Sequence, residues 1–288
     1  MATIELRNAD KVFGSPASGN YEDVLRNINL AIDDGEFVAI VGYSGTGKTT
    51  LINLLSGLVT PSRGEALYHG KPITGPDPER GLIFQNYSLL PWLTVYGNVA
   101  LAVDQKFSSW SRRDRDTQIR RFIDMVNLSP AIDKRPAELS GGMRQRVAVA
   151  RTLAMDPEVL LMDEPLGALD ALTRGELQRE ISQIWEKQRK TALLITNSVD
   201  EGLLMADRII PLTLGPGATL GPEFKVDLPR PRVAEELNRD PNYTRLRKEI
   251  TEYLIQIGEP EGEGPDNIIP LPDIQPLDPD EKSTYTWI

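Results

Sequence analysis

The chain is organised around one nine-residue stretch, Gly42-Tyr43-Ser44-Gly45-Thr46-Gly47-Lys48-Thr49-Thr50. This stretch has the pattern G-x-x-x-x-G-K-T. The apolar run before it, Glu36–Val41, predicts a strand, and the run after it, Leu51–Gly57, has helical spacing. A glycine-rich loop between a strand and a helix curls its backbone N–H groups around a phosphate, and the helix N-terminus adds the positive end of its dipole. The stretch therefore predicts a phosphate-binding site.

The residues of this loop have separate predicted roles. Lys48 is expected to reach the β- and γ-phosphates of a nucleotide, and the Thr49 hydroxyl is expected to ligate Mg²⁺. The remaining contacts to the nucleotide are expected from Gly42, Ser44, Gly45, Gly47 and Thr50. A glycine-rich turn without chemistry is the alternative, but it leaves the flanking strand and helix unexplained.

Composition excludes several classes of site. The 288 residues include no cysteine, so a disulfide framework and a cysteine zinc site are excluded, and the one histidine, His69, cannot form a cluster. The net charge of −10 argues against general binding to nucleic-acid phosphates. No uninterrupted apolar run approaches the roughly 20 residues that span a bilayer. We therefore expect a protein that does not enter the membrane by itself.

The pattern along the chain alternates strands with helices, which predicts a mostly parallel α/β sheet. The expected strands are Ile4–Leu6, Val24–Ile32, Glu65–Tyr68, Lys71–Ile73, Gly81–Phe84, Val159–Met162, Ala192–Thr196, Arg208–Leu214 and Glu223–Leu228. The expected helices are Val95–Val103, Thr117–Val126, one that starts at Ser140, Asp170–Gln188, Asp200–Ala206 and a helical stretch within Val233–Ile257. His69 is expected in a turn between two short strands.

Two acidic residues, Asp163 and Glu164, directly follow the buried strand Val159–Met162. The carboxyl end of a parallel strand faces the ligand crevice. Asp163 is therefore a candidate Mg²⁺ ligand opposite Thr49, and Glu164 is a candidate to orient or deprotonate an attacking water. The alternative is a pair of acids that cap a turn before Pro165.

A second anion site is predicted at Leu139-Ser140-Gly141-Gly142-Met143-Arg144-Gln145-Arg146. A serine N-cap followed by two glycines and a long helix leaves backbone donors free for a ligand. One nucleotide rarely needs two phosphate cradles. We therefore expect Ser140, Gly141 and Gly142 to serve the nucleotide of a partner subunit.

These motifs, in this order, resemble those of the ATP-binding subunits of ABC transporters over about residues 1–230. The resemblance implies an α/β fold with a P-loop NTPase (RecA-like) core, an antiparallel β subdomain and a helical signature-motif subdomain. It further implies that Gln85 bridges Mg²⁺ and a transmembrane partner and that Asp170 belongs to the D-loop (168–170). It also implies that Phe13 stacks on adenine, with Tyr21 as the weaker candidate and ordinary packing as the alternative for either ring. Two such subunits would enclose two ATP molecules head to tail, each site being completed by Ser140–Gly142 of the other subunit.

The resemblance divides the chain into three parts. Residues 1–232 would form the ATPase domain, with the helical subdomain at about 87–155, and residues 233–257 would form a helical extension. Residues 258–288 read as an acidic, proline-rich, flexible tail, because they hold eight acidic residues and one lysine. The acidity of the chain therefore belongs mostly to this tail.

One position departs from the family pattern. Where the family has a switch histidine beside the γ-phosphate, this chain has Asn197, within Leu193–Glu201. An amide donates a hydrogen bond to a phosphate oxygen but cannot carry a proton near pH 7. We hypothesise that hydrolysis is slower than is usual in the family or depends on a partner subunit. The alternative is that Asn197 supplies sufficient positioning, since phosphoryl transfer relies largely on positioning and electrostatics.

A narrower resemblance concerns the branch of importer. Phe84–Trp92 and Leu166–Arg174 are similar to the nitrate/sulfonate/taurine branch, whereas Leu214–Gly221 and Leu228–Arg232 are most similar to the nitrate and bicarbonate members. This implies an ATPase that powers import of a small anion, nitrate/nitrite or bicarbonate, with a sulfonate or taurine importer as the alternative.

The same resemblance implies the partners. They are a second ATPase subunit, two transmembrane permease subunits that dock near Tyr87–Trp92, and a separate periplasmic or lipid-anchored solute-binding protein. The apolar residues near Tyr87–Trp92 are alternatively ordinary core packing. The expected location is the cytoplasmic face of the inner membrane, as a peripheral subunit that binds no nucleic acid.

Two further functions stay open. One is a catalytically weakened regulatory subunit in a heterodimer, which Asn197 favours and Glu164 opposes. The other is a soluble ABC ATPase of DNA repair or translation, which usually carries coiled-coil or tandem-domain insertions that this sequence lacks.

Overall fold

The computed structural model describes residues 2–14, 19, 21–167 and 169–258. The strands are β1 (Ala2–Phe13), β2 (Glu22–Asp33), β3 (Phe37–Val41), β4 (Arg63–Tyr68), β5 (Lys71–Pro72), β6 (Arg80–Ile83), β7 (Val159–Asp163), β8 (Thr191–Thr196), β9 (Arg208–Pro211) and β10 (Phe224–Lys225). The α-helices are α1 (Lys48–Ser56), α2 (Val95–Lys106), α3 (Arg112–Met125), α4 (Gly141–Ala154), α5 (Ala171–Gln188), α6 (Val199–Met205), α7 (Ala234–Leu237) and α8 (Pro241–Gly258), and single 3-10 turns lie at Ser129–Ala131 and Pro136–Glu138.

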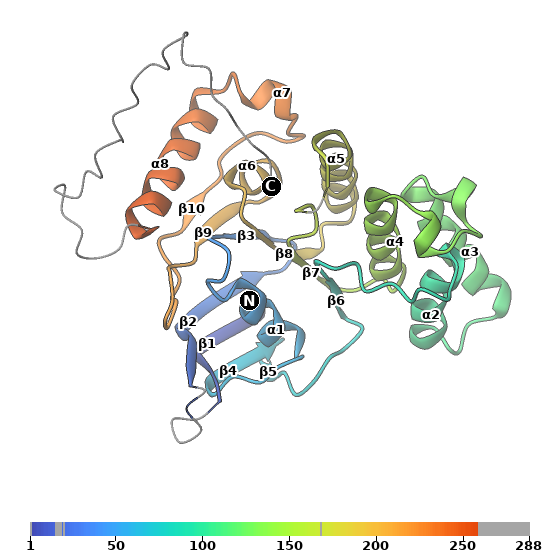
Figure 1. Ribbon diagram of the computed structural model, residues 1–288, viewed down its shortest axis with the longest axis horizontal. Helices are drawn as coiled ribbons and strands as arrows, with labels where there is room; N and C mark the ends of the chain where they lie inside the picture. Colours follow the sequence, from blue (N-terminus) through green and yellow to red (C-terminus); the bar gives the residue numbers. More distant parts are fainter. Residues whose placement is uncertain (1, 15–18, 20, 168, 259–288) are drawn as a thin grey trace, which may run out of the picture. The chain divides into compact units, whose positions relative to one another are not determined.

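Two sheets organise these elements (Figure 1). A six-stranded sheet has the order β10-β9-β3-β8-β7-β6. Its strands are parallel except for β10, which pairs antiparallel with β9 at one edge. A second, antiparallel sheet has the order β2-β1-β4-β5. The predicted α/β class, with a mostly parallel sheet and an antiparallel β part, is confirmed.

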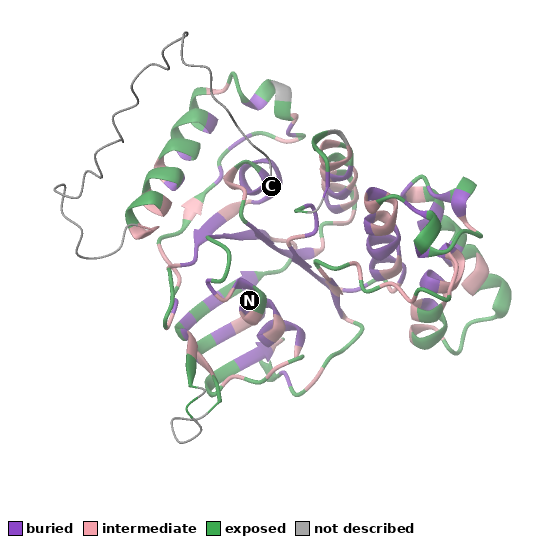
Figure 2. Ribbon diagram, in the orientation of Figure 1, coloured by how far each residue is buried: buried purple, intermediate pink, exposed green. Residues whose placement is uncertain are grey.

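The central strands β3, β7 and β8 are buried at every position and are mostly apolar, as parallel strands between two layers are. Along β3, the side chains of Phe37, Ala39 and Val41 enter one apolar cluster, whereas Val38 and Ile40 enter another. The first cluster also contains residues of α2–α6 and α8, and the second contains residues of α1 and the antiparallel sheet. Figure 2 shows the resulting run of buried residues through the central strands.

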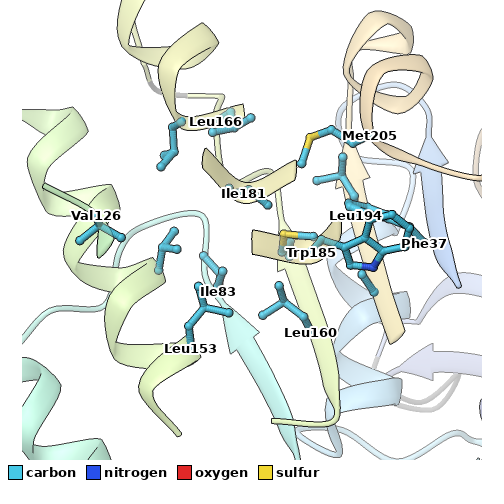
Figure 3. Packing of buried hydrophobic residues seen from close by; sticks show 14 of the residues in the cluster. Phe37, Ile83, Val126, Leu153, Leu160, Leu166, Ile181, Trp185, Leu194 and Met205 are labelled. Carbon is cyan, nitrogen blue, oxygen red and sulfur yellow. The ribbon is translucent and has the colours of Figure 1, made fainter. Parts of the chain in front are cut away.

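Figure 3 shows the first cluster at close range. The indole of Trp185 on α5 meets the ring of Phe37 edge to face, with 5.3 Å between ring centroids. Leu153 from α4 and Leu160 from β7 belong to the same cluster (Figure 3). The helices α2, α3 and α4 pack on one another as a separate helical part that joins the sheet through α4.

Several expected boundaries differ from those in the structure. The first strand is longer than Ile4–Leu6, because β1 pairs along its whole length with β2 and along part of it with β4. The strand expected at Arg208–Leu214 ends at Pro211. The turn expected at His69 is present, and His69 adopts a left-handed φ of 48° there.

The strand expected at Glu223–Leu228 is wrong beyond Lys225. The cause is the buried Arg232, whose guanidinium donates to the carbonyls of Val226 and Leu228 and also to those of Leu203 and Ala206. These carbonyls are satisfied by one side chain, so the segment needs no neighbouring strand.

The helical stretch expected within Val233–Ile257 is two helices, α7 and α8, separated at 238–240. Pro241 begins α8, at the position where a missing N–H costs nothing. The Asp240 carboxylate accepts from the backbone N–H of Asn242 and so caps this start. The predicted flexible tail, 258–288, lies outside the described residues except for Gly258. Among the described residues, no helix is both long enough and apolar enough to cross a membrane.

Candidate functional site

The site is built on the phosphate loop, Gly42–Gly47, between β3 and α1. Gly47 is the N-cap of α1 in a left-handed conformation with φ of 96°, and it offers no side-chain cap to the helix. A Cβ at Gly47 would lie 2.8 Å from Cγ1 of Val24, so only glycine fits. The first backbone N–H groups of α1 are therefore left to bind an anion.

Lys48 is folded back onto this loop. Its Nζ donates to the carbonyl oxygens of Gly42 at 3.1 Å and Tyr43 at 2.6 Å, and it lies 3.6 Å from Oε1 of Glu164. Burial lowers the pKa of Lys48, and the nearby Glu164 opposes this shift. The Lys48 side chain is only 4% exposed and is already fixed beside the loop. Its ammonium group would therefore lose little further conformational freedom when an anion binds.

The acid pair ends β7, and both acids face the loop. The Thr49 hydroxyl donates to Oδ1 of Asp163 at 3.3 Å. Burial raises the pKa of Asp163. Oε2 of Glu164 accepts from the amide Nε2 of Gln85 at 3.2 Å. Since β3, β6 and β7 are parallel, their carboxyl ends meet at one edge, and this brings together the loop, Gln85 and the acids.

These groups line a hollow of about 430 Å³. Its lining residues are Phe13, Glu22, Val24, Ser44, Gly45, Gly47, Lys48, Thr49, Thr50, Gln85 and Glu164. Phe13 lies at its edge, 39% exposed, with Nζ of Lys11 4.7 Å from its ring centroid. Tyr21 instead lines a neighbouring hollow with Leu214 and Pro216. Both hollows include residues of the phosphate loop, but only Phe13 shares a hollow with Lys48, Gln85 and Glu164.

Asn197 is exposed and lies beside Ser44, a residue of the hollow. Its Nδ2 lies 3.5 Å from Oγ of Ser44. Asn197 belongs to the switch segment, Thr196–Ser198, between β8 and α6. The Ser198 hydroxyl caps α6 by accepting from the backbone N–H of Glu201 at 3.3 Å. The side chain predicted at the γ-phosphate position is therefore next to the loop, as an amide.

The second predicted anion site is not part of this hollow. Ser140 caps α4, and its Oγ accepts from the backbone N–H of Met143 at 3.2 Å. A Cβ at Gly142 would lie 2.3 Å from Cγ2 of Thr173, which explains a glycine there. Asp170 caps α5 by accepting from the backbone N–H of the same Thr173 at 3.1 Å. Ser140, Gly141, Gly142 and Asp170 thus group around the starts of α4 and α5, while residue 168 lies outside the described residues.

Two features of the site were not predicted from the sequence. The first is Arg151 of α4, whose guanidinium donates to the carbonyls of Tyr87 at 3.0 Å and Ser88 at 2.6 Å. Tyr87 and Ser88 both have a left-handed φ, so Arg151 holds a strained turn that follows Gln85. No local sequence pattern predicts this contact, because Arg151 lies more than sixty residues from Tyr87 and Ser88 along the chain.

The second feature is Glu201 on α6, which is buried beside the switch segment. Its Oε2 accepts from the Thr196 hydroxyl, and the Thr196 oxygen accepts from the backbone N–H of Ser198 at 3.1 Å. Burial raises the pKa of Glu201. An acidic residue on an apolar helix face, five residues after a threonine, is the signal in the sequence.

A phosphate loop, an acid pair and two amides at the carboxyl edge of a parallel sheet define an α/β domain that binds a nucleoside triphosphate. The family model for ABC transporters matches residues 25–167. The nitrate transport protein NasD of Klebsiella oxytoca is 48% identical over 88% of this chain and 96% of NasD. The chain belongs to the ABC transporter family, among its ATP-binding subunits.

Other relatives are longer than this chain. The bicarbonate transport ATP-binding protein CmpC of Synechocystis sp. is 50% identical over 88% of this chain, but the match spans only 38% of CmpC. Among solved structures, the dimeric ATP-binding cassette MJ0796, bound to ADP and Pi in a post-hydrolysis state, has a TM-score of 0.70 and 30% identity. That match covers 78% of this chain and 99% of the MJ0796 chain.

The pKa of Glu201 generates a prediction about stability. Because the pKa is raised in the folded protein, the folded state holds the proton more tightly than the unfolded state. The contribution of Glu201 to the free energy of unfolding is fully present below its ordinary pKa of 4.5. It is lost as pH rises through the raised pKa that Glu201 has in the folded protein. Glu201→Gln keeps an acceptor for Thr196 and removes the buried charge. We expect it to be about 1 kcal/mol more stable than wild type at pH 8, with a smaller gain at pH 5.

Urea unfolding of the full chain at the two pH values measures this difference. Glu252→Gln, an exposed glutamate on α8, is the control and is expected to show no such change with pH. An equal effect of Glu201→Gln at pH 5 and pH 8 would contradict the assignment.

Proposed function

We propose that this chain binds ATP with Mg²⁺ in the hollow and hydrolyses it to power import of a small anion. The observation that carries the proposal is the convergence of Lys48, Thr49, Gln85 and Glu164 on one hollow below an uncapped helix start, with Asp163 hydrogen-bonded to Thr49. A triphosphate fits this arrangement because the loop supplies N–H donors and Lys48 supplies a cation.

The oxygen ligands in the hollow suit Mg²⁺, which prefers carboxylate and hydroxyl oxygens and takes its other ligands from phosphate and water. Thr49 and Asp163 would hold the ion, with Gln85 close by at Glu164. No group of three His, Cys, Asp or Glu side chains suited to a metal occurs in the described part of the chain. The ion is therefore expected to arrive with the nucleotide, where it would neutralise developing charge on the transferred phosphoryl group.

In the proposed reaction each side chain has one task. Glu164 accepts hydrogen bonds from the attacking water and orients it, while Lys48 and the loop N–H groups stabilise charge on the γ-phosphate. Asn197 donates to a γ-phosphate oxygen from the opposite side. Phe13 stacks on adenine at the edge of the hollow.

A second cassette is needed to complete this site. At the start of α4, Ser140 is exposed and Gly141 is half-buried, whereas Gly142 is buried and packs on Thr173. They are absent from the lining of the hollow in their own chain. We propose that they cover the γ-phosphate bound by a partner subunit, whose Ser140–Gly142 stretch or equivalent covers this one.

The permease subunits are proposed to dock on the loop before α2. Trp92 is 66% exposed in this loop. The buried Asn98 holds the loop in place, because its Nδ2 donates to three carbonyls, those of Leu90, Leu93 and Thr94, and its Oδ1 accepts from the Leu90 N–H. An exposed indole on a rigid loop suits an apolar helix of a membrane partner. With such a dock, the chain is proposed to work at the cytoplasmic face of the membrane, together with a separate solute-binding protein on the other side.

The solute is proposed to be nitrate/nitrite or bicarbonate. This proposal is supported by two relatives, the nitrate transport protein NasD and the bicarbonate transport protein CmpC, each near 50% identical to this chain. A sulfonate or taurine importer is the less favoured alternative.

Replacement of Glu164 tests the proposed function. In cells whose own gene is replaced by Glu164→Gln, uptake of labelled nitrate and bicarbonate is measured, and ATP binding and hydrolysis are measured on the purified full chain. We expect the variant to bind ATP, to lose hydrolysis by about 100-fold or more, and to lose uptake of one of the two anions.

The exposed Glu249→Gln on α8 is the matched control and should retain both activities. Hydrolysis and uptake that survive Glu164→Gln would contradict the proposed mechanism. If cells that lack the gene still take up both nitrate and bicarbonate as wild-type cells do, the proposed solutes would be contradicted.

Asn197 supports a second candidate, a weakened ATPase subunit that depends on an active partner. We expect Asn197→His to raise steady-state ATP hydrolysis of the assembled complex several-fold at neutral pH, since the imidazole can carry a proton beside the γ-phosphate. Asn242→His on the exposed face of α8 is the control. An unchanged rate in Asn197→His would mean that the amide already supplies the positioning that the reaction needs.

A further inference from the structure

The C-terminal helix α8 packs on α6 and not on the helical part of the molecule (Figure 1). Its buried face consists of Tyr243, Leu246 and Ile250, at helical spacing. The opposite face is exposed. An apolar stripe therefore packs α8 against the ATPase core. The polar contacts of α8 determine which segments of the core the helix positions.

The first polar contact reaches the switch side of the hollow. The Tyr243 hydroxyl donates to Oδ1 of Asp200 at 2.7 Å, and Nε of Arg247 donates to the same oxygen at 2.6 Å. A second Arg247 nitrogen lies 3.3 Å from Oδ2. Asp200 lies in the first turn of α6, three residues after Asn197. The pKa of Arg247 is raised by its hydrogen bond to Asp200.

The second polar contact reaches the phosphate loop. The Tyr43 hydroxyl donates to the carbonyl oxygen of Leu254 at 3.1 Å. The Tyr43 ring also packs on Gly258, where a Cβ would lie 2.7 Å from the hydroxyl oxygen. The carbonyl of Tyr43 in turn accepts from Nζ of Lys48 at 2.6 Å and from the Thr46 hydroxyl at 3.0 Å.

One helix thus contacts both Tyr43, which precedes Ser44 of the hollow, and Asp200, which follows Asn197. Arg247 and Leu254 are seven residues apart on α8, which corresponds to about 10 Å along a helix. Between the two contacts, the Asn197 amide meets the Ser44 hydroxyl at 3.5 Å. A tilt of α8 that moves one of these contacts relative to the other would therefore change the separation of Asn197 and Ser44.

We propose that Tyr243, Arg247 and Tyr43 are positioning residues, and that α8 holds the switch segment and the phosphate loop at the separation that hydrolysis requires. This inference rests on the proposed ATPase function of the hollow. It assigns α8 a role in the geometry of the reacting phosphate, beyond that of an appendage to the domain.

The Asp200–Arg247 pair is half exposed on both sides, 49% and 56%, and exposed ion pairs contribute little to global stability. A positioning role and a structural role therefore predict different outcomes. Loss of positioning lowers kcat while leaving the unfolding midpoint and the affinity for ATP nearly unchanged.

The test uses the full chain carrying Tyr243→Phe and Arg247→Gln together. Hydrolysis of Mg²⁺-ATP, ATP affinity and thermal unfolding are measured side by side. We expect kcat to fall about tenfold, with KM and the unfolding midpoint close to wild type. Arg247→Lys, which keeps the charge, is expected to recover part of kcat. Arg245→Gln is the matched control, since Arg245 pairs only along α8 with Glu249 at 3.0 Å.

Hydrogen exchange supplies a readout that does not depend on activity. Backbone amides of residues 43–47 and 196–203 are expected to exchange faster in the double variant than in wild type or Arg245→Gln. An unchanged kcat, unchanged exchange or a matching fall in the control would overturn the proposed role of α8 while leaving the ATPase function intact. A wild-type chain that neither binds nor hydrolyses ATP would overturn the proposed function itself.

Discussion

The structure depends on one constraint, a helix that begins without a cap directly after a buried parallel strand. Gly47 gives α1 no side-chain acceptor, so among the described residues no side chain caps the first N–H groups of the helix. Buried donors without partners cost free energy, which an anion at this point recovers. Lys48, folded onto the carbonyls of its own loop, adds the cation. The other groups of the site, Asp163, Glu164, Gln85 and Asn197, lie around this loop and helix start.

The parallel order of the sheet brings the rest of the chemistry to the same edge. Strands β6, β7 and β8 lie side by side and end at Gln85, the acid pair and the switch segment. The helical part presents Ser140 away from this hollow, on α4, while Arg151 of the same helix grips the turn after Gln85. The helical part is thereby hydrogen-bonded to the turn that follows Gln85, whose amide donates to Glu164.

Whether a feature of the fold or the site could be predicted from the sequence depends on how far apart along the chain its interacting residues lie. The phosphate loop, the acid pair and the Ser140 stretch are local patterns, and each lies where its pattern predicts a strand, loop or helix. The end of β10 was not predictable, because nothing local tells that the Arg232 guanidinium turns inward to bind four carbonyls. The link of α8 to Asp200 and Tyr43 was missed for the same reason, since its partners lie more than forty residues away.

The central claim is that the hollow is half of an ATP site and that a second copy of the chain can complete it. Sedimentation of the full chain in the Glu164→Gln background, with and without Mg²⁺-ATP, tests this most directly. The account predicts a monomer without ATP and a dimer with it, and it predicts that Ser140→Arg abolishes the dimer while each monomer still binds ATP. A chain that binds ATP and remains monomeric, or a Ser140→Arg variant that dimerises as its parent does, would contradict the account.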